Sequence, residues 1–192
     1  LHFDHCGDAV IRNNNGILEP AFKNANFWSH ESHWQWATNP NIREKASFLP
    51  ENILPLEESG QLRLLKGNDF LMENTPLGFD IILVNGHTEK QMLPVIKYKN
   101  KTLVFAGDLV PTAGHLPLAY IPGYDIRPLI SIKEKDRILN LACEKKFMLF
   151  MEHDPFNELI ELSNTDKGVR MNRNHTLKSC LLYTSDAADD RI

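Results

Sequence analysis

The sequence lacks an apolar run long enough to cross a membrane as a helix. Its longest apolar segments, residues 81–84 and 147–151, have the length of buried strands, whereas a membrane helix needs roughly 20 apolar residues. Cysteine is also scarce: the chain has three among 192 residues, and Cys6 and Cys143 are far apart in the sequence. We therefore expect no membrane span and no disulfide framework, and the redox compartment stays open.

The chain also lacks a cluster of positive charge. Its 21 Lys and Arg residues are outnumbered by 25 Asp and Glu residues, the net charge is -4, and the basic residues are scattered apart from short mixed stretches such as residues 97–101. Nucleic-acid binding depends on clustered basic side chains that neutralise phosphates. The charge balance therefore argues against nucleic acid as the main partner, while the oligomeric state is left open.

The two ends of the sequence carry further expectations. Position 1 is Leu, and a dense group of His and Asp residues follows within two positions. Metal ligands need folded chain on both sides, so we expect further strands before Leu1, and a cytoplasmic or exported location stays open. Residues 180–192 resemble the translation of a sequencing adapter, the alternative being a natural acidic tail. We predict an incomplete domain over residues 1–179 and a non-native tail over residues 180–192.

Hydrophobic patterns predict a mixed α/β domain. Strands are expected at residues 25–29, 61–66, 70–73, 79–84, 92–98, 102–106, 147–151, 158–162 and 168–171, with a hairpin turn at residues 99–101. Helices are expected at residues 7–12, at residues 31–38, and at residues 42–54 with a break at Pro50. Ser131 and Glu134 have the spacing of a capping box, which predicts an amphipathic helix from Ser131 to about Lys145.

Four short segments combine His or Asp in ways typical of metal ligands. They are His2-Phe3-Asp4-His5, Gly86-His87-Thr88, Ala106-Gly107-Asp108 and Glu152-His153-Asp154. Each of the last three directly follows a hydrophobic strand, which places its side chains at the edge of a sheet. Imidazole nitrogens and carboxylate oxygens bind zinc, and a catalytic zinc keeps one position open for water. Four such segments in one chain therefore predict a metal site.

The order of these segments is similar to that of a known superfamily. Residues 2–7 resemble the later part of the His-x-His-x-Asp-His signature of the metallo-β-lactamase superfamily, and His87, Asp108 and His153 match its remaining ligand motifs in order. The resemblance covers essentially all of residues 1–179. Residues 105–111, followed by His115, Tyr124-Asp125 and Pro128, resemble the lactonase and methyl-parathion-hydrolase-like branch. The first His of the signature would precede Leu1.

This resemblance implies an α/β fold, the αβ/βα four-layer sandwich of metallo-β-lactamases, without its N-terminal strands here. It implies two Zn²⁺ ions, or other divalent metals. His2 and His87 would bind the first metal, Asp4, His5 and His153 the second, and Asp108 would bridge both. A metal-bridging hydroxide would then hydrolyse a small-molecule substrate, a lactone or a related ester, with Asp108 and Asp4 as the catalytic carboxylates.

Other activities stay open beside the lactonase hypothesis. Within the superfamily they are a thioester hydrolase of the glyoxalase II type, a β-lactamase and a phosphotriesterase. A different class is a catalytically inactive metal-binding fragment.

Several residues near these motifs have two interpretations each. His115 and Asp125 either line the pocket or support the metal ligands, or they lie in loops without a role. Asp125 has Arg127 as a candidate ion-pair partner. Trp28 and its aromatic neighbours either line a substrate pocket or pack in the core. We interpret Asp8 as a surface or capping residue rather than a ligand, Cys6 as a small buried side chain, and His30 and His33 as surface residues.

Overall fold

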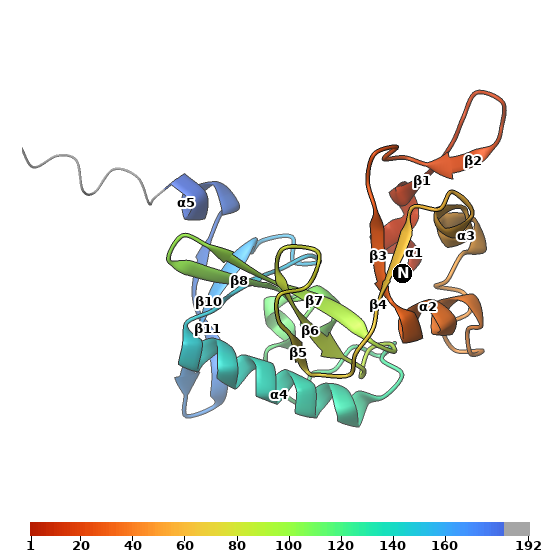
Figure 1. Ribbon diagram of the computed structural model, residues 1–192. Helices are drawn as coiled ribbons and strands as arrows, with labels where there is room; N and C mark the ends of the chain where they lie inside the picture. Colours follow the sequence, from red (N-terminus) through yellow and green to blue (C-terminus); the bar gives the residue numbers. More distant parts are fainter. Residues whose placement is uncertain (183–192) are drawn as a thin grey trace, which may run out of the picture. The chain divides into compact units, whose positions relative to one another are not determined.

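Seven of the predicted strands form one mixed sheet, in the order β11-β10-β9-β8-β7-β6-β5 (Figure 1). The computed structural model describes residues 1–182. The strands are β5 (Leu71–Met72), β6 (Asp80–Val84), β7 (Gln91–Tyr98), β8 (Lys101–Phe105), β9 (Met148–Phe150), β10 (Leu159–Thr165) and β11 (Gly168–His175). Strands β8 and β9 run parallel. Their C-terminal ends therefore meet at the same edge of the sheet.

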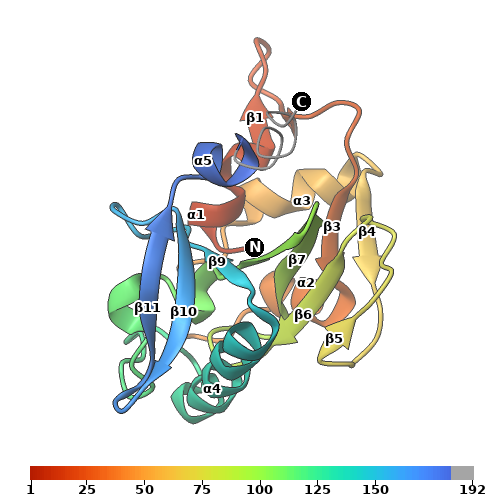
Figure 2. The same ribbon diagram turned by 90° about the vertical axis from the view of Figure 1, so that its left-hand side faces the viewer.

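This sheet belongs to the second of two compact units, which comprises residues 69–88 and the described chain from Met92 onward. Helix α4 (Pro128–Lys145) packs against β10 and β11 (Figure 2). Ile138, Leu139 and Ala142 of α4 join the buried core of the sheet. The hairpin predicted at residues 99–101 is confirmed, because β7 and β8 pair antiparallel on either side of it.

Helix α4 begins at Pro128 rather than at the predicted cap Ser131. The capping-box prediction is wrong because both of its side chains make contacts outside the helix. The Ser131 hydroxyl donates to Asp125, and the Glu134 carboxylate accepts backbone N–H groups of residues 85 and 86. Proline suits the first position of a helix because its φ is already helical and no partner is needed for its nitrogen.

Helix α5 (Leu177–Leu182) follows β11 at the end of the described chain. Cys180 on this helix is buried and packs with Leu103, Met148 and Leu159. The predicted tail boundary at residue 180 therefore falls inside α5, and residues 183–192 of that tail lie outside the described residues.

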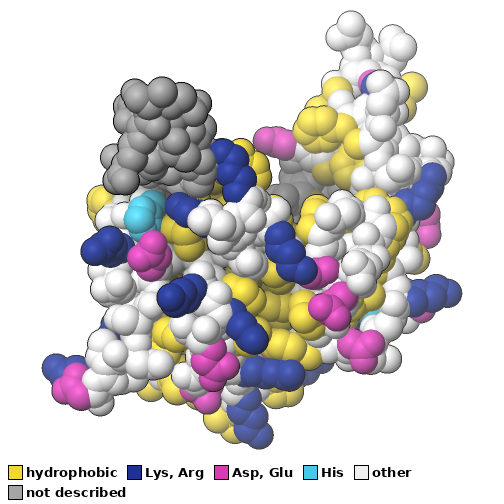
Figure 3. All heavy atoms as spheres, turned by 60° about the vertical axis from the view of Figure 1, so that its left-hand side comes forward, with side chains coloured by type: hydrophobic (Ala, Val, Ile, Leu, Met, Phe, Trp, Pro, Cys, Tyr) yellow, Lys and Arg dark blue, Asp and Glu magenta, His cyan; other side chains and the backbone are white. Residues whose placement is uncertain are grey.

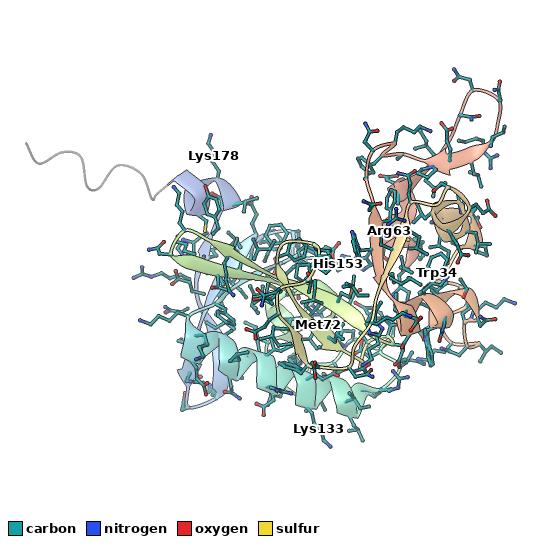
Figure 4. The ribbon with its side chains drawn as sticks, in the orientation of Figure 1. Trp34, Arg63, Met72, Lys133, His153 and Lys178 are labelled. Carbon is teal, nitrogen blue, oxygen red and sulfur yellow. The ribbon has the colours of Figure 1, made fainter. Side chains whose placement is uncertain are left out.

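The first unit comprises residues 1–68 and 89–91. Its elements are α1 (Phe3–Cys6), the 3-10 turn η1 (Gly7–Ala9), β1 (Val10–Arg12), β2 (Leu18–Pro20), β3 (Phe27–His30), α2 (Glu31–Thr38), α3 (Pro50–Glu58) and β4 (Leu62–Leu65). Strands β1 and β2 pair antiparallel, and β3 and β4 pair parallel. The core of this unit gathers around Trp34 of α2 (Figure 4), Phe48 and Ile53.

Two predictions for the first unit are wrong. Residues 7–12 form the turn η1 and strand β1 instead of a helix. The helix predicted from residue 42 is replaced by turns, in which the Asn41 side chain accepts the backbone N–H groups of Arg43 and Glu44. Pro50 begins α3 instead of ending a helix, again because proline suits a first helical position.

Among the described residues 1–182, no helix is long and apolar enough to span a membrane.

Candidate metal centre

The turn after β6 holds His87 in a fixed place. All five residues of β6 are buried, and the turn that follows is tied to α4 because Glu134 accepts the N–H groups of Asn85 at 2.8 Å and Gly86 at 2.9 Å. A Cβ atom on Gly86 would lie 2.2 Å from the Ser131 hydroxyl oxygen and 2.4 Å from the Ser131 backbone nitrogen. Only glycine therefore allows this approach of the turn to α4, and His87 follows as a buried residue.

Asp108 lies between two histidines. It follows β8 in the 3-10 turn η2 (Gly107–Leu109), where Gly107 has a φ of 46°. Its Oδ2 atom lies 3.2 Å from Nε2 of His87, and its Oδ1 atom lies 3.2 Å from Nε2 of His153. His153 is on the loop after β9 (Figure 4). The parallel pairing of β8 and β9 brings these two strand ends together, and the Ala106 N–H donates to the Phe150 carbonyl there at 2.9 Å.

A second carboxylate holds the other side of the His87 ring. Nδ1 of His87 lies 3.0 Å from Oδ1 of the buried Asp125, whose Oδ2 accepts the Ser131 hydroxyl at 2.5 Å. Burial lowers the pKa of His87, but the hydrogen bonds and charges of Asp108 and Asp125 outweigh burial and raise the pKa to about 9. The surroundings of this ring therefore favour positive charge, whether it is a proton or a metal ion. Such carboxylate partners are typical of metal-binding histidines, since they fix the ring and its tautomer.

The chemistry of these three side chains fits divalent metal ions. Each oxygen of the Asp108 carboxylate faces one imidazole nitrogen. Each side of the carboxylate therefore has one oxygen and one nitrogen that can bind a metal. Nitrogen and oxygen donors of this kind bind zinc. Within the second unit, the structure thus brings together three of the six predicted ligands, His87, Asp108 and His153.

The other three predicted ligands lie in the first unit, at its first helix. His2 precedes α1 and is buried, while Asp4 and His5 on α1 are exposed. The Asp4 carboxylate lies 3.7 Å from Nε2 of His5. His2 contacts Glu44, with its Nε2 atom 3.3 Å from Oε1 of that side chain. The short helix thus carries a carboxylate and an imidazole, Asp4 and His5, at consecutive positions.

The residues with two interpretations are placed as follows. His115 is half-buried in the turn η3 (Ala113–His115), and its Nδ1 atom lies 2.9 Å from the Thr112 hydroxyl. Trp28 is half-buried on β3, opposite Arg63 of β4. Asp8 is exposed. Cys6 is half-buried, and burial raises the pKa of its thiol.

His30 and His33 are buried, so their prediction as surface residues is wrong. His30 caps α2, because its Nδ1 atom accepts the Ser32 N–H at 3.1 Å and its Nε2–H donates to the Gly67 carbonyl at 2.7 Å. His33 contacts the carbonyl of Glu89. Gly67 and Glu89 are far from these histidines in the sequence, so the spacing of residues alone does not reveal the two contacts.

Sequence reasoning also missed charged residues that support these sites. Glu44 and Lys135 are buried, and Glu134 fixes the turn before His87. The helical spacing of α4 indicates that Lys135 is buried, because Lys135 lies on the same face as Ser131, Ile138 and Leu139. The sequence around Glu44 gives no such indication of burial, because Glu44 lies in a segment of turns without a regular period.

A separate cavity of about 590 Å³ lies between α4 and the sheet. Asp80 lines it, and since Asp80 begins β6 whereas His87 follows its end, the cavity is remote from Asp108. Its rim is mixed in charge: Lys97 pairs with Asp80 at 2.8 Å, and the Arg137 guanidinium lies 3.5 Å from the Phe70 ring centre. Lys and Arg side chains are likewise interspersed with Asp and Glu on the face in Figure 3.

Solved structures of metal-dependent hydrolases are similar to this chain. A probable metal-dependent hydrolase from Staphylococcus aureus has a TM-score of 0.75 and 24% identity, over 90% of this chain and 58% of its own. AidC, a dizinc quorum-quenching lactonase in complex with a product, has a TM-score of 0.68 and 18% identity, over 83% of this chain and 58% of its own. The hydrolase AbOPH of the beta lactamase superfamily has a TM-score of 0.64 and 18% identity, over 82% and 57%.

No protein-family model and no curated protein matches the sequence. The chain spans less than two thirds of the length of the three similar structures. The similarity extends over 82–90% of this chain, at TM-scores of 0.64–0.75. The chain therefore has the metallo-β-lactamase fold.

Proposed function

We propose that the protein is a metal-dependent hydrolase that uses two divalent metal ions to cleave an ester bond in a lactone or a related compound. Zinc is the metal that we propose for both ions. The observation that carries this proposal is the position of the Asp108 carboxylate, with one oxygen 3.2 Å from His87 and the other 3.2 Å from His153. A carboxylate that can bind through both oxygens is suited to hold two cations close together.

We assign His2 and His87 to the first metal, and Asp4, His5 and His153 to the second. Asp108 is the ligand of both. When bound, a pair of divalent ions lowers the pKa of a water molecule and polarises a carbonyl or phosphoryl oxygen. Asp108 would hold both ions and, with Asp4, would orient that water. The carboxylate of Asp125 contacts Nδ1 of the His87 ring, and the hydroxyl of Ser131 donates to that carboxylate. Together they hold the ring in place.

Support for a lactone substrate comes from the similar structures, one of which is a lactonase bound to its product. Two half-buried or exposed groups near the His87 turn suit an uncharged organic substrate. The Tyr124 ring packs edge-on against His87 with ring centres 5.5 Å apart, and His115 lies on the segment after Asp108. An aromatic ring beside a polar centre is typical of small-molecule sites.

Hydrolysis of a substrate panel tests this function. The zinc-loaded chain is assayed on an acyl-homoserine lactone, a nitrophenyl ester, a glutathione thioester, nitrocefin and a paraoxon-type phosphotriester. We expect the lactone to be hydrolysed fastest, with turnover lost after chelation and in Asp108→Asn. Faster turnover of the thioester, the β-lactam or the phosphotriester would replace the lactone by that substrate. A chain that binds two metals but hydrolyses none of the five would contradict the hydrolase function.

A further inference from the structure

We infer that Asp154 is a positioning residue that fixes His153 beside Asp108. The inference rests on the proposed function, which makes His153 and Asp108 metal ligands. Nε2 of His153, on the loop after β9, lies 3.2 Å from Oδ1 of Asp108. The side chain of His153 is 32% exposed, whereas that of His87 is 4% exposed. Packing therefore holds His153 less firmly than His87, and the backbone of its loop has to place it.

The Asp154 carboxylate stiffens this loop from within. Its Oδ1 atom accepts the backbone N–H groups of Phe156 at 3.0 Å and of Asn157 at 3.1 Å, and the Asn157 side chain donates to both carboxylate oxygens at 3.1 Å. Such a side chain takes the place of a backbone partner in a turn. The base of the loop is closed because the Met151 N–H donates to the Glu158 carbonyl at 2.8 Å. The path of the loop backbone is therefore defined.

The same carboxylate joins the loop to the segment that follows Asp108. Oδ2 of Asp154 accepts the backbone N–H of Ala113 at 2.8 Å, and Ala113 begins the turn η3. Hydrogen bonds to an ionised carboxylate are roughly twice as strong as those between neutral groups. The parallel pairing of β8 with β9 joins the same two segments before the site. Along both segments, the contact between Asp108 and His153 therefore lies between the strand pairing and this hydrogen bond.

The replacement Asp154→Asn removes the link to Ala113 and keeps the turn of the loop. Oδ1 has more donors than Oδ2, so the amide oxygen of the new side chain should take the Oδ1 position. Its NH₂ group then faces the Ala113 N–H, and two donors do not bond to each other. Asp166→Asn is the matched control, because Asp166 is exposed in the turn between β10 and β11 and its replacement removes the same charge.

A second variant, Ala113→Pro, removes the same hydrogen bond from the donor side, because proline has no backbone N–H. Ala113 is the first residue of η3, and Thr112 before it has a φ of -141° and a ψ of 163°. A residue before proline prefers this extended conformation, so the replacement suits the backbone. The Asp154 carboxylate keeps its charge in this variant. An effect that both variants share therefore comes from the hydrogen bond and not from the charge.

Nuclear Overhauser effects in the metal-free chains report the contacts of Asp108, and competition with a chromophoric chelator reports zinc affinity. In the parent chain and the control, we expect effects from the Asp108 β-protons to the rings of His87 and His153. In both variants we expect the effect to His153 to be lost and the effect to His87 to stay, because Asp125 holds that ring. The affinity for one of the two zinc ions should fall about 10-fold or more. Thermal unfolding identifies a variant that has lost its fold, and the other variant then decides.

A role of Asp154 in loop stability alone predicts a different result. The variants would then melt at a lower temperature but keep the contact between His153 and Asp108 and the zinc affinity of the parent chain. That result would overturn the inference, and so would a parent chain without this contact. A parent chain that binds no zinc would contradict the proposed function instead. The comparison of contacts in the metal-free chains still decides the role of Asp154 in that case.

Discussion

Lys135 is fully buried in α4, and its ammonium group donates to three backbone carbonyls. These are the carbonyls of His115 and Pro117, each at 2.9 Å, and of Tyr120 at 2.8 Å. The three acceptors lie on the segment that follows the Asp108 turn. One side chain thereby fixes six consecutive residues of loop against α4, and its burial makes the fold sensitive to its charge.

Burial lowers the pKa of Lys135 from its ordinary value of 10.5 to about 8, although the charge of Asp125 acts in the opposite direction. The unfolded chain then binds this proton more tightly than the folded chain, so stability should rise with pH between about 8 and 10.5. We predict that the free energy of unfolding of the parent chain rises relative to that of Lys135→Met by up to about 3 kcal/mol over this window. Urea unfolding at several pH values measures it, and parallel profiles for the two proteins would contradict the prediction.

Gly86 is the second residue on which the local geometry depends. Gly86→Ala places a Cβ atom within 2.5 Å of the backbone of Ser131. Overpacking of this kind costs about 1–3 kcal/mol, and we expect urea unfolding of Gly86→Ala to show a loss in that range. Gly123→Ala is the control, because no described atom lies within 4 Å of a Cβ there. Equal stability of the two variants would mean that the turn before His87 is not held against α4.

Residues of the site differ in how far they could be predicted. His87, Asp108 and His153 each follow a strongly hydrophobic strand, and this pattern is enough to expect them at a sheet edge. The buried charges of Glu44 and Lys135 could not be predicted in the same way. Charged residues are almost never buried unless they are paired, and their partners come from other segments, such as His2 for Glu44.

At the scale of elements, prediction succeeded where the hydrophobic period was regular. Helix α2 occupies the predicted residues 31–38, and strands β6 to β11 lie within a few residues of their predicted bounds. It failed where tertiary contacts decide a boundary, as for Ser131, whose hydroxyl binds Asp125 instead of capping α4. The short pair β1 and β2 was missed because three-residue strands carry too little periodic signal.

Helix α5 is the element at which the predicted tail begins, and two truncations should differ there. We predict that deleting residues 183–192, whose sequence resembles that of an adapter, leaves the melting temperature unchanged. Deleting residues 180–192 also removes Cys180, whose sulfur lies 3.9 Å from the Met148 sulfur in a buried cluster. We expect that loss to lower the melting temperature by a few degrees, corresponding to roughly 1 kcal/mol.

Calorimetry of the three chains makes the comparison. A drop of more than a few degrees on deleting residues 183–192 alone would show that they belong to the natural protein.

For the whole molecule, the fold expected from four short ligand segments agrees with the similar solved structures, although their identities of 18–24% are low. Metal coordination restricts residue type more strongly than core packing does, so ligand segments indicate a fold better than core residues do. The substrate is set by pocket residues instead. Neither the order of the motifs nor the strand order specifies those residues, so the substrate assignment depends on the proposed panel.

In the proposed centre Asp108 is shared by two metal ions, and the metal content of the whole chain tests this sharing most directly. Elemental analysis after zinc supplementation and removal of free metal should give about two zinc ions per parent chain. Asp108→Ala should bind clearly less than one, because both ions lose a ligand, while Asp8→Ala, which changes an exposed carboxylate near the same ligands, should still bind about two. Less than half an equivalent in the parent chain, or a larger loss in Asp8→Ala than in Asp108→Ala, would contradict the account.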